Sequence, residues 1–221
     1  RPETTLIFCN TKIDTDRVAN ELRAVGYAAL ALHGDLEQKQ RDQTLVCFAN
    51  RSASVLVATD VAARGLDIDA LDLVINYQIA SELEVHTHRI GRTGRAGAQG
   101  IACSLYVHRE NHKIGLLEDY LEENFERNDL PDIALLDQPV FYPPMVTLHI
   151  AGGKKQKLRA GDIVGALTGI DGIPGTAIGK IQVGDNWSYV AVTNEHGKTA
   201  FNKLNEGTLK GRSFKVRRLR G

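Results

Sequence analysis

Short runs rich in apolar residues alternate with amphipathic stretches along the first 125 residues of the chain. Five of these runs have the length and composition of buried strands. They cover residues 6–9, 29–32, 54–58, 73–76 and 101–107. Between them, apolar residues recur at helical spacing. The predicted helices cover residues 14–25, 36–49, 82–89 and 110–125. Strands that alternate with helices predict an α/β domain whose parallel sheet is covered on both faces.

From residue 145 the apolar pattern changes to strict alternation. Val146, Leu148 and Ile150 alternate with Thr147 and His149, which is the period of a half-buried strand. Later strands are predicted over residues 178–183, 187–193 and 213–219, and helices over 160–167 and 198–205. The resulting order, βαββαβ, is that of the ferredoxin-like α+β fold, which RNA-recognition domains share.

Prolines without a clear period separate the two patterns. They are Pro131, Pro139, Pro143 and Pro144. Such spacing favours an irregular connection. We therefore expect an α/β domain over residues 1–130, a linker over 131–144 that packs partly on that domain, and an α+β domain over 145–221.

Polar clusters follow the predicted strands of the first domain. Asn10 follows the first strand, His-Gly-Asp at residues 33–35 follows the second, and Thr-Asp at residues 59–60 follows the third. In open parallel sheets, ligands bind in the crevice outside the carboxyl ends of the strands. We therefore expect these loops to share one edge of the sheet.

The stretch His-Arg-Ile-Gly-Arg-Thr-Gly-Arg at residues 88–95 has an arginine at every third position. On a helix end or tight turn, this spacing puts Arg92 and Arg95 on one face, where their guanidinium groups can bind phosphate oxygens bidentately. The preceding glycines remove side chains that would keep a polyphosphate at a distance. Taken alone, the stretch also fits a solvated arginine-glycine patch or a nonspecific RNA-binding segment.

The formal net charge of zero hides a division of charge along the chain. Residues 1–144 carry 14 Lys and Arg against 22 Asp and Glu, whereas residues 145–221 carry 13 against 5. The first part therefore has a net charge of −8 and the second a net charge of +8. This division predicts that the second domain faces a polyanion.

Cysteine usage and hydropathy bear on location. Cys9, Cys47 and Cys103 are widely spaced in apolar runs and are odd in number, which favours reduced cysteines and a cytoplasmic location. His86 and His88 have no cysteines nearby, so we expect no metal site. No apolar stretch approaches the ~18–20 residues of a membrane span, and no signal peptide is evident. The abrupt start, two residues before a strand, favours a piece cut from a longer protein.

Five motifs stand in a fixed order over about a hundred residues. They are Ile-Phe-Cys-Asn-Thr at 7–11, His-Gly-Asp at 33–35 with Gln38 and Arg41, Ala-Thr-Asp-Val-Ala-Ala-Arg-Gly-Leu-Asp at 58–67, Val-Ile-Asn-Tyr at 74–77, and residues 88–95. This ordered set resembles the second RecA-like domain of DEAD-box RNA helicases. Gly-Gly-Lys-Lys at 152–155, with Gly-Asp at 161–162 and Gly-Ala-Leu at 165–167, resembles the ribosomal-RNA-binding tail domain of bacterial DbpA-type helicases. The resemblance covers nearly the whole chain.

The resemblance implies a set of nucleotide-binding and catalytic residues. Arg92 and Arg95 match arginine fingers that reach the γ-phosphate held by the other RecA-like domain, which can be worth ~10³–10⁵ in rate. Asp67, after the turn at Gly65, matches a carboxylate that accepts a hydrogen bond from the ribose, although Asp is also a common turn cap. His88 is expected to couple the nucleotide side to the RNA side, or else is a satisfied structural histidine. The role of Arg64 stays open between bracing the γ-phosphate and pairing with a carboxylate.

RNA-binding positions follow from the same resemblance. In the first domain, Asn10, Gly34, Arg41 and Thr59 match positions that contact the phosphates and 2′-hydroxyls of single-stranded RNA. Arg41 could instead pair with Glu37 one helical turn away.

In the second domain, two basic stretches favour electrostatic RNA binding over a merely solvated face. The first stretch is Lys154, Lys155, Lys157 and Arg159, and the second is Lys210, Arg212, Lys215, Arg217, Arg218 and Arg220. Trp187 and Tyr189 share one sheet face, where RNA-recognition domains stack bases. The first strand offers Thr147 and His149 there instead of the usual aromatic residue, so Tyr189 either stacks on a base or packs with Trp187.

The sequence thus predicts the C-terminal part of an ATP-dependent RNA helicase. The resemblance implies that it remodels structured 23S ribosomal RNA in the large ribosomal subunit precursor. A phosphate loop and an Asp-Glu-Ala-Asp motif are absent from the sequence, so ATP and Mg²⁺ are expected mainly on an N-terminal RecA-like domain of the same protein. This fragment alone is expected to bind RNA without hydrolysing ATP. A non-catalytic RNA-binding adaptor and a DNA-directed superfamily 2 helicase are the alternatives.

Overall fold

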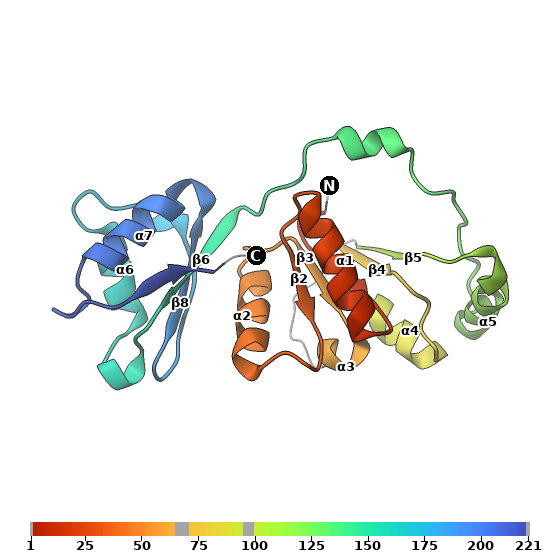
Figure 1. The fold of residues 1–221 in the computed structure, drawn as a ribbon, viewed down its shortest axis with the longest axis horizontal. Helices are drawn as coiled ribbons and strands as arrows, with labels where there is room; N and C mark the ends of the chain where they lie inside the picture. Colours follow the sequence, from red (N-terminus) through yellow and green to blue (C-terminus); the bar gives the residue numbers. More distant parts are fainter. Residues whose placement is uncertain (1, 65–70, 95–99, 220–221) are drawn as a thin grey trace. The chain divides into compact units, whose positions relative to one another are not determined.

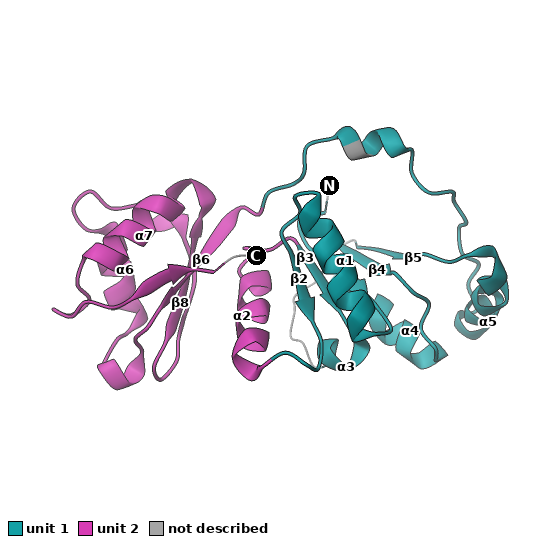
Figure 2. Ribbon diagram, viewed as in Figure 1, with its two compact units in different colours: residues 1–36, 55–142 teal, residues 37–54, 143–221 magenta. Residues whose placement is uncertain are grey.

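A computed structural model describes residues 2–64, 71–94 and 100–219. The chain forms two compact units (Figure 2). Unit 1 comprises residues 1–36 and 55–142, and unit 2 comprises residues 37–54 and 143–221. The predicted domains differ from these units in one element, because helix α2 (Gln38–Ala49) was expected in the first domain and belongs to unit 2.

Unit 1 is built on a five-stranded parallel sheet with strand order β2-β3-β1-β4-β5 (Figure 1). The strands are β1 (Thr5–Phe8), β2 (Ala29–Leu32), β3 (Val55–Ala58), β4 (Leu73–Asn76) and β5 (Ile101–Ser104). β1 and β3 bury all of their side chains, and β2 buries Ala29 and Leu32, as their unbroken apolar sequences favour. The α/β fold class predicted for this part is confirmed.

Helices cover both faces of this sheet. They are α1 (Lys12–Ala24), α3 (Asp60–Ala63), α4 (Leu83–Ile90) and α5 (Asn111–Leu121), with 3₁₀ turns η2 (His108–Glu110) and η3 (Ile133–Asp137). Val18 and Ala19 of α1 pack with Ile7 and Val57 on one face. Arg89 of α4 lies over the ring of Phe8, which points to the opposite face. The predicted two-sided covering is therefore present.

Two predicted elements end early. β5 stops at Ser104, three residues before the expected end of that strand. α5 stops at Leu121 because Glu122 adopts a left-handed conformation and donates its N–H to the carbonyl of Glu118. In the segment that follows, Ile133 is 79% exposed, whereas Val140 is half-buried and lies against Gly26. Phe125 near the start of this segment and Val140 near its end therefore pack on unit 1.

Unit 2 contains a four-stranded antiparallel sheet with strand order β7-β8-β6-β9. Its elements are β6 (Met145–Ile150), α6 (Ala160–Thr168), β7 (Ile178–Val183), β8 (Ser188–Thr193), α7 (Gly197–Glu206) and β9 (Val216–Arg218), with turns η4 (Lys154–Gln156), η5 (Gly175–Ala177) and η6 (Asn194–His196). The predicted βαββαβ order is confirmed.

Both faces of the unit 2 sheet are covered. The alternating apolar residues of β6, such as Leu148, form a core with Ile163 of α6 and Leu204 of α7. On the opposite face, α2 and the turn after it contact Thr147. Asn50 donates to the Thr147 hydroxyl at 3.1 Å, and the Ser52 and Thr147 hydroxyls lie 2.6 Å apart. In the part of the chain that the structure describes, no helix is long and apolar enough to cross a membrane.

Candidate functional site

A buried arginine joins three loops at the C-terminal edge of the unit 1 sheet. Arg89 is 1% exposed, and its Nε and Nη2 donate to the two carboxylate oxygens of Asp60 at 2.6 and 2.7 Å. Its Nη1 donates to the carbonyl of Gln78 at 2.7 Å, and Nη2 also donates to Oδ1 of Asn10 at 2.7 Å. Because Asn10 follows β1, Asp60 follows β3 and Gln78 follows β4, one guanidinium fixes the relative positions of these loops.

Arg89 and Asp60 have no role predicted from the sequence. In the sequence, Arg89 is one of three arginines at every third position, and this spacing does not show which of them is buried. A signal was present nonetheless. Arg89 lies three residues after His86, which is 2% exposed, so an amphipathic helix puts both on its buried face. Burial, and then the charge of Arg89, lowers the pKa of His86 below its usual value. A buried cation needs a carboxylate partner, and Asp60 directly follows a buried strand.

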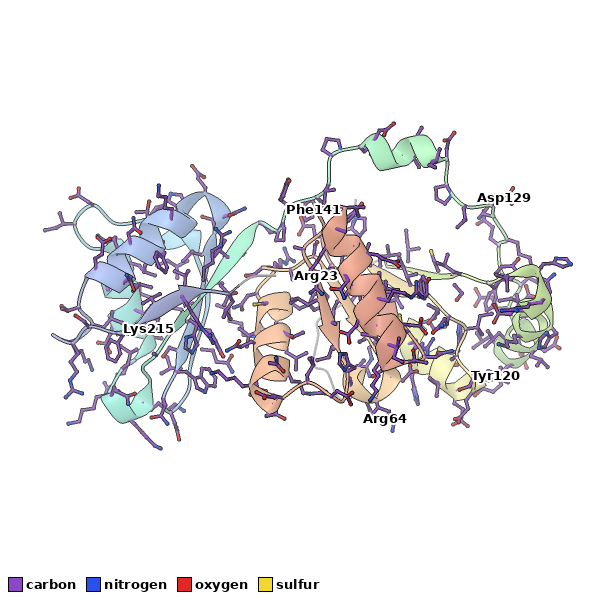
Figure 3. The ribbon with its side chains drawn as sticks, in the orientation of Figure 1. Arg23, Arg64, Tyr120, Asp129, Phe141 and Lys215 are labelled. Carbon is purple, nitrogen blue, oxygen red and sulfur yellow. The ribbon has the colours of Figure 1, made fainter. Side chains whose placement is uncertain are left out.

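A pocket of about 190 Å³ opens beside this network. Arg64 comes from the end of α3, and His88 and Arg92 come from the end of α4. The remaining lining residues are Phe8, Asp60, Ala63, Val85 and Arg89. The structure therefore brings together two of the predicted catalytic residues, His88 and Arg92. Arg64, labelled in Figure 3, joins them.

The backbone around Arg92 is anchored to the start of β4. The Arg92 carbonyl accepts a hydrogen bond from the N–H of Leu71, and the Thr93 hydroxyl donates to the Leu71 carbonyl. These bonds hold the turn after α4 in a fixed position. Gly65, Asp67 and Arg95, which complete the predicted nucleotide-binding set, lie outside the described residues.

The predicted RNA-binding positions of unit 1 lie on neighbouring loops. The Thr59 N–H donates to the Leu32 carbonyl, so the loop after β3 adjoins the loop after β2 that carries the exposed Gly34. A Cβ added to Gly34 would meet no protein atom within 4 Å, so space beside its backbone is open. The Asn10 side chain donates to the carbonyl of Ile79 and accepts from Arg89.

Arg41, which was expected to join these positions, lies on α2 in unit 2. The Arg41 residue is half-buried, and its backbone N–H donates to the backbone carbonyl of Glu37.

In unit 2, the two basic stretches meet. The Lys210 ammonium donates to the carbonyl of Lys157 at 2.9 Å and lies 3.3 Å from a carboxylate oxygen of Asp162. The first stretch is positioned by backbone bonds from Lys154 and Lys155 to the carbonyls of residues 184 and 185. The exposed residues of the two basic stretches are Lys154, Lys155, Lys157, Arg159, Lys210, Arg212, Lys215, Arg217 and Arg218. Lys215 is labelled in Figure 3, and Arg220 lies outside the described residues.

Tyr189 on the other face of the unit 2 sheet is buried, whereas Trp187 and His149 beside it are half-buried. Tyr189 is 3% exposed, and its ring centroid lies 4.6 Å from that of Trp187 and 5.4 Å from that of His149. Burial lowers the pKa of His149 to about 4, with further contributions from the charges of Arg217 and Lys39. A base can stack on Tyr189 only after its ring is uncovered, so the stacking assignment stays a prediction.

Comparison with known proteins connects these features to a family. Residues 1–97 match the family model "Helicase conserved C-terminal domain", and residues 147–218 match the "DbpA RNA binding domain". The DEAD-box protein SrmB of Escherichia coli, in its crystal structure, is 32% identical, with a TM-score of 0.55. The match covers 64% of this chain and 81% of the SrmB chain. This chain belongs to the DEAD-box helicase family.

Two curated DbpA proteins place this DEAD-box chain in the DbpA-type branch. It is 48% identical over 223 residues to the ATP-dependent RNA helicase DbpA of E. coli, with 100% of this chain and 48% of the relative covered. It is 35% identical to the Bacillus subtilis protein of the same name, with 97% and 49% covered. The chain therefore spans about half the length of the curated relatives it matches. The pocket and the Arg89 network fall inside the first matched model, and the two basic stretches fall inside the second.

Proposed function

We propose that the intact protein containing this chain is an ATP-dependent RNA helicase that remodels a structured element of 23S ribosomal RNA in the large-subunit precursor, in the cytoplasm. The observation that carries the proposal is the Arg89 network. It joins Asn10, a predicted RNA-binding residue, to Asp60 and the helix that presents His88 and Arg92. A residue set of this kind suits an enzyme in which nucleotide and RNA binding depend on each other.

The pocket fits phosphate groups better than a whole nucleotide. Arg64, Arg92 and His88 line it, and guanidinium and imidazole N–H groups can donate to phosphate oxygens. Its volume of about 190 Å³ is below the ~300–1,000 Å³ of typical small-molecule sites. The base and Mg²⁺ would therefore be held mainly by the N-terminal RecA-like domain. Bound ATP would supply the phosphoanhydride bond whose cleavage drives the cycle.

The predicted site residues then have the following proposed roles. Arg92 and Arg95 would neutralise negative charge on the γ-phosphate, and Asp67 beside Gly65 would accept a hydrogen bond from the ribose. His88 would link this region to the RNA side. Asn10, Gly34, Thr59 and Arg41 would bind the RNA backbone, and the two basic stretches of unit 2 would hold the structured RNA nearby.

Substitution of Arg92 in the intact helicase tests the enzymatic part. Arg92→Ala should reduce RNA-stimulated ATP hydrolysis by about 10³-fold or more and leave RNA affinity unchanged, because a finger acts on transition-state charge. Arg23→Ala is the matched control, since Arg23 lies on α1 away from the pocket (Figure 3). Hydrolysis by Arg92→Ala at the unaltered rate would contradict the finger role of Arg92, whereas absence of RNA-stimulated hydrolysis by the unaltered intact protein would favour a non-catalytic adaptor.

The isolated chain offers a second test. We expect it to bind RNA without hydrolysing ATP, and RNA-stimulated turnover by the purified chain would refute that division of labour. Competition between the RNA and DNA forms of one hairpin shows which nucleic acid the chain prefers. Equal competition by DNA would favour the DNA-directed alternative.

A further inference from the structure

A second and larger cavity lies in unit 1, beyond the C-terminal ends of β4 and β5. Its volume is about 1080 Å³. Its walls come from α1, from the turn after β4, from residues 104–111 and from residues 127–130, which include Asp129 (Figure 3). The last two segments lie outside both matched family models, which end at residue 97 and begin at residue 147. None of the roles proposed above uses this cavity.

Aromatic rings and guanidinium groups both line this cavity. The Arg17 guanidinium lies 5.6 Å from the centroid of the Tyr77 ring, and its Nη2 donates to the Tyr77 hydroxyl. Tyr106 is half-buried and lines the same cavity, together with the exposed Arg109 and Arg127. Stacking platforms combined with cations are the features by which proteins bind single-stranded nucleic acids without reading base edges.

The cavity lies next to Asn10, one of the predicted RNA-binding residues of unit 1. Gln78 lines the cavity, and its Oε1 accepts the backbone N–H of Asn10 at 2.8 Å. Its Nε2 donates to Asp14 at 3.0 Å, and Asp14 also accepts from Arg17 at 2.9 Å. Two residues therefore separate Asn10 from the cationic wall. A strand whose backbone passes Asn10 therefore runs close to the cavity.

The charge balance favours a single strand over a duplex. Glu110 and Asp129 line the cavity with the three arginines, so its positive charge is modest. Arg17 and Arg127 already pair with Asp14 and Glu118, but their side chains are 45% and 51% exposed. Exposed pairs of this kind are weak, and a guanidinium has five donors, so both arginines can also bind phosphate.

We propose that this cavity binds the single-stranded continuation of the RNA strand that lies along the loops at Asn10 and Thr59. A base stacks on Tyr106, and the phosphates face Arg17, which lies over the Tyr77 ring, together with Arg109 and Arg127. The proposal rests on the proposed RNA-binding function of unit 1 and adds to it the path of the strand beyond those loops.

Crosslinking with the complete chain tests the path. The probe is a single-stranded oligoribonucleotide of about 12 nucleotides that carries 4-thiouridine at successive positions. Mass spectrometry then identifies the crosslinked peptides. We expect crosslinks to residues 104–111 from one end of the probe and to the loops at Asn10 or Gly34 from its interior.

Matched variants separate stacking from folding. Tyr106 packs against a small core that contains Ile114, so Tyr106→Leu keeps apolar contact there and removes the aromatic face. Tyr106→Leu should lower crosslinking at residues 104–111 by about 5-fold to 100-fold, and Tyr106→Phe should restore it. Arg109→Ala should also lower it. Tyr120→Leu is the control, because Tyr120 is exposed on α5 and does not line the cavity (Figure 3).

The crosslinking outcomes distinguish failure of the cavity proposal from failure of the proposed function. Crosslinks at Asn10 or Gly34 without any at residues 104–111 would overturn the cavity proposal and leave the proposed function standing. Crosslinks confined to unit 2 would overturn both. Crosslinks at residues 104–111 that Tyr106→Leu and Arg109→Ala do not reduce would also refute the proposal, because the RNA would then lie there without using the ring or the guanidinium.

Discussion

At the scale of single residues, two ion pairs of equal length differ in burial. Arg89 and Asp60 lie 2.6 Å apart with the arginine 1% exposed, whereas Lys12 and Asp35 lie 2.6 Å apart with both side chains more than half exposed. Breaking a buried pair strands a charge in a low dielectric, while an exposed pair is replaced by water. The N–O distance alone therefore does not show how much either ion pair contributes to the free energy of unfolding.

Arg89→Met should lower the free energy of unfolding of unit 1 by about 3–5 kcal/mol, because Asp60 and the Gln78 carbonyl lose their donor. Lys12→Met should lower it by less than about 1 kcal/mol. Urea denaturation followed by circular dichroism measures both. Equal effects of the two substitutions would show that the Arg89 network does not hold the three loops together.

His149 should make the stability of unit 2 depend on pH. Burial and neighbouring cations lower its pKa to about 4, whereas an unfolded histidine titrates near 6.5. Between pH 6.5 and 4 the unfolded chain therefore binds a proton that the folded chain does not, and the stability of unit 2 falls as pH falls. His149→Gln should show a smaller fall. Thermal melts followed by the fluorescence of Trp187, the single tryptophan, measure this, and equal falls would contradict it.

At the residue scale, the motif at residues 88–95 predicted roles for His88 and Arg92. The structure places both at one pocket, and their roles stay predictions. The same spacing gave no hint that Arg89 points inward, because burial depends on the angle at which a helix meets its sheet.

At the scale of elements, periodicity predicted the bounds of β2, β4 and β7 to the residue. It missed α3, whose four residues are too short to establish a period. It also gave no packing partner for α2. The apolar residues of that helix cluster near its end instead of forming a stripe, so the sequence did not reveal that α2 covers the face of the unit 2 sheet that holds Tyr189 and Thr147.

Thiol reactivity tests the packing of α2. Cys47 on α2 is 2% exposed and burial raises its pKa to about 11, and Cys9 is buried as well, whereas Cys103 is exposed. Reaction with an aromatic disulfide reagent at pH 8 should modify Cys103 quickly and the other two only after unfolding in urea. Rapid modification of Cys47, identified by mass spectrometry, would show that α2 does not stay on the sheet.

A pair of glycines tests the turn that carries the first basic stretch. A Cβ on Gly153 would lie 2.2 Å from the carbonyl oxygen of Gly184, whereas one on Gly161 of α6 would meet nothing within 4 Å. Gly153→Ala should therefore destabilise unit 2 by about 1–3 kcal/mol and weaken RNA binding. Gly161→Ala should be neutral or stabilise by about 0.5–1 kcal/mol. Equal melting temperatures would contradict the tight approach at Gly153.

At the scale of the whole molecule, the order of the two folds was predictable because the period of apolar residues changes at residue 145. The contents of the two units were not, since α2 is contiguous with the strands of unit 1 in sequence and packs with unit 2. The division into an acidic first part and a basic second part follows directly from the sequence. Lys210 and Lys157 are far apart in sequence, so their contact required the structure.

The salt dependence of RNA binding tests the central claim, that the basic stretches of unit 2 hold a structured RNA, most directly. Affinity of the chain for a 23S ribosomal RNA hairpin should fall steeply with salt, because each neutralised phosphate releases a counterion. Lys155→Gln should reduce the slope of log K against log salt by about 0.7–0.9, and Lys198→Gln, an exposed lysine outside both stretches, should leave it unchanged. A flat dependence for the unaltered chain, or equal slopes for the chain and both variants, would contradict the account.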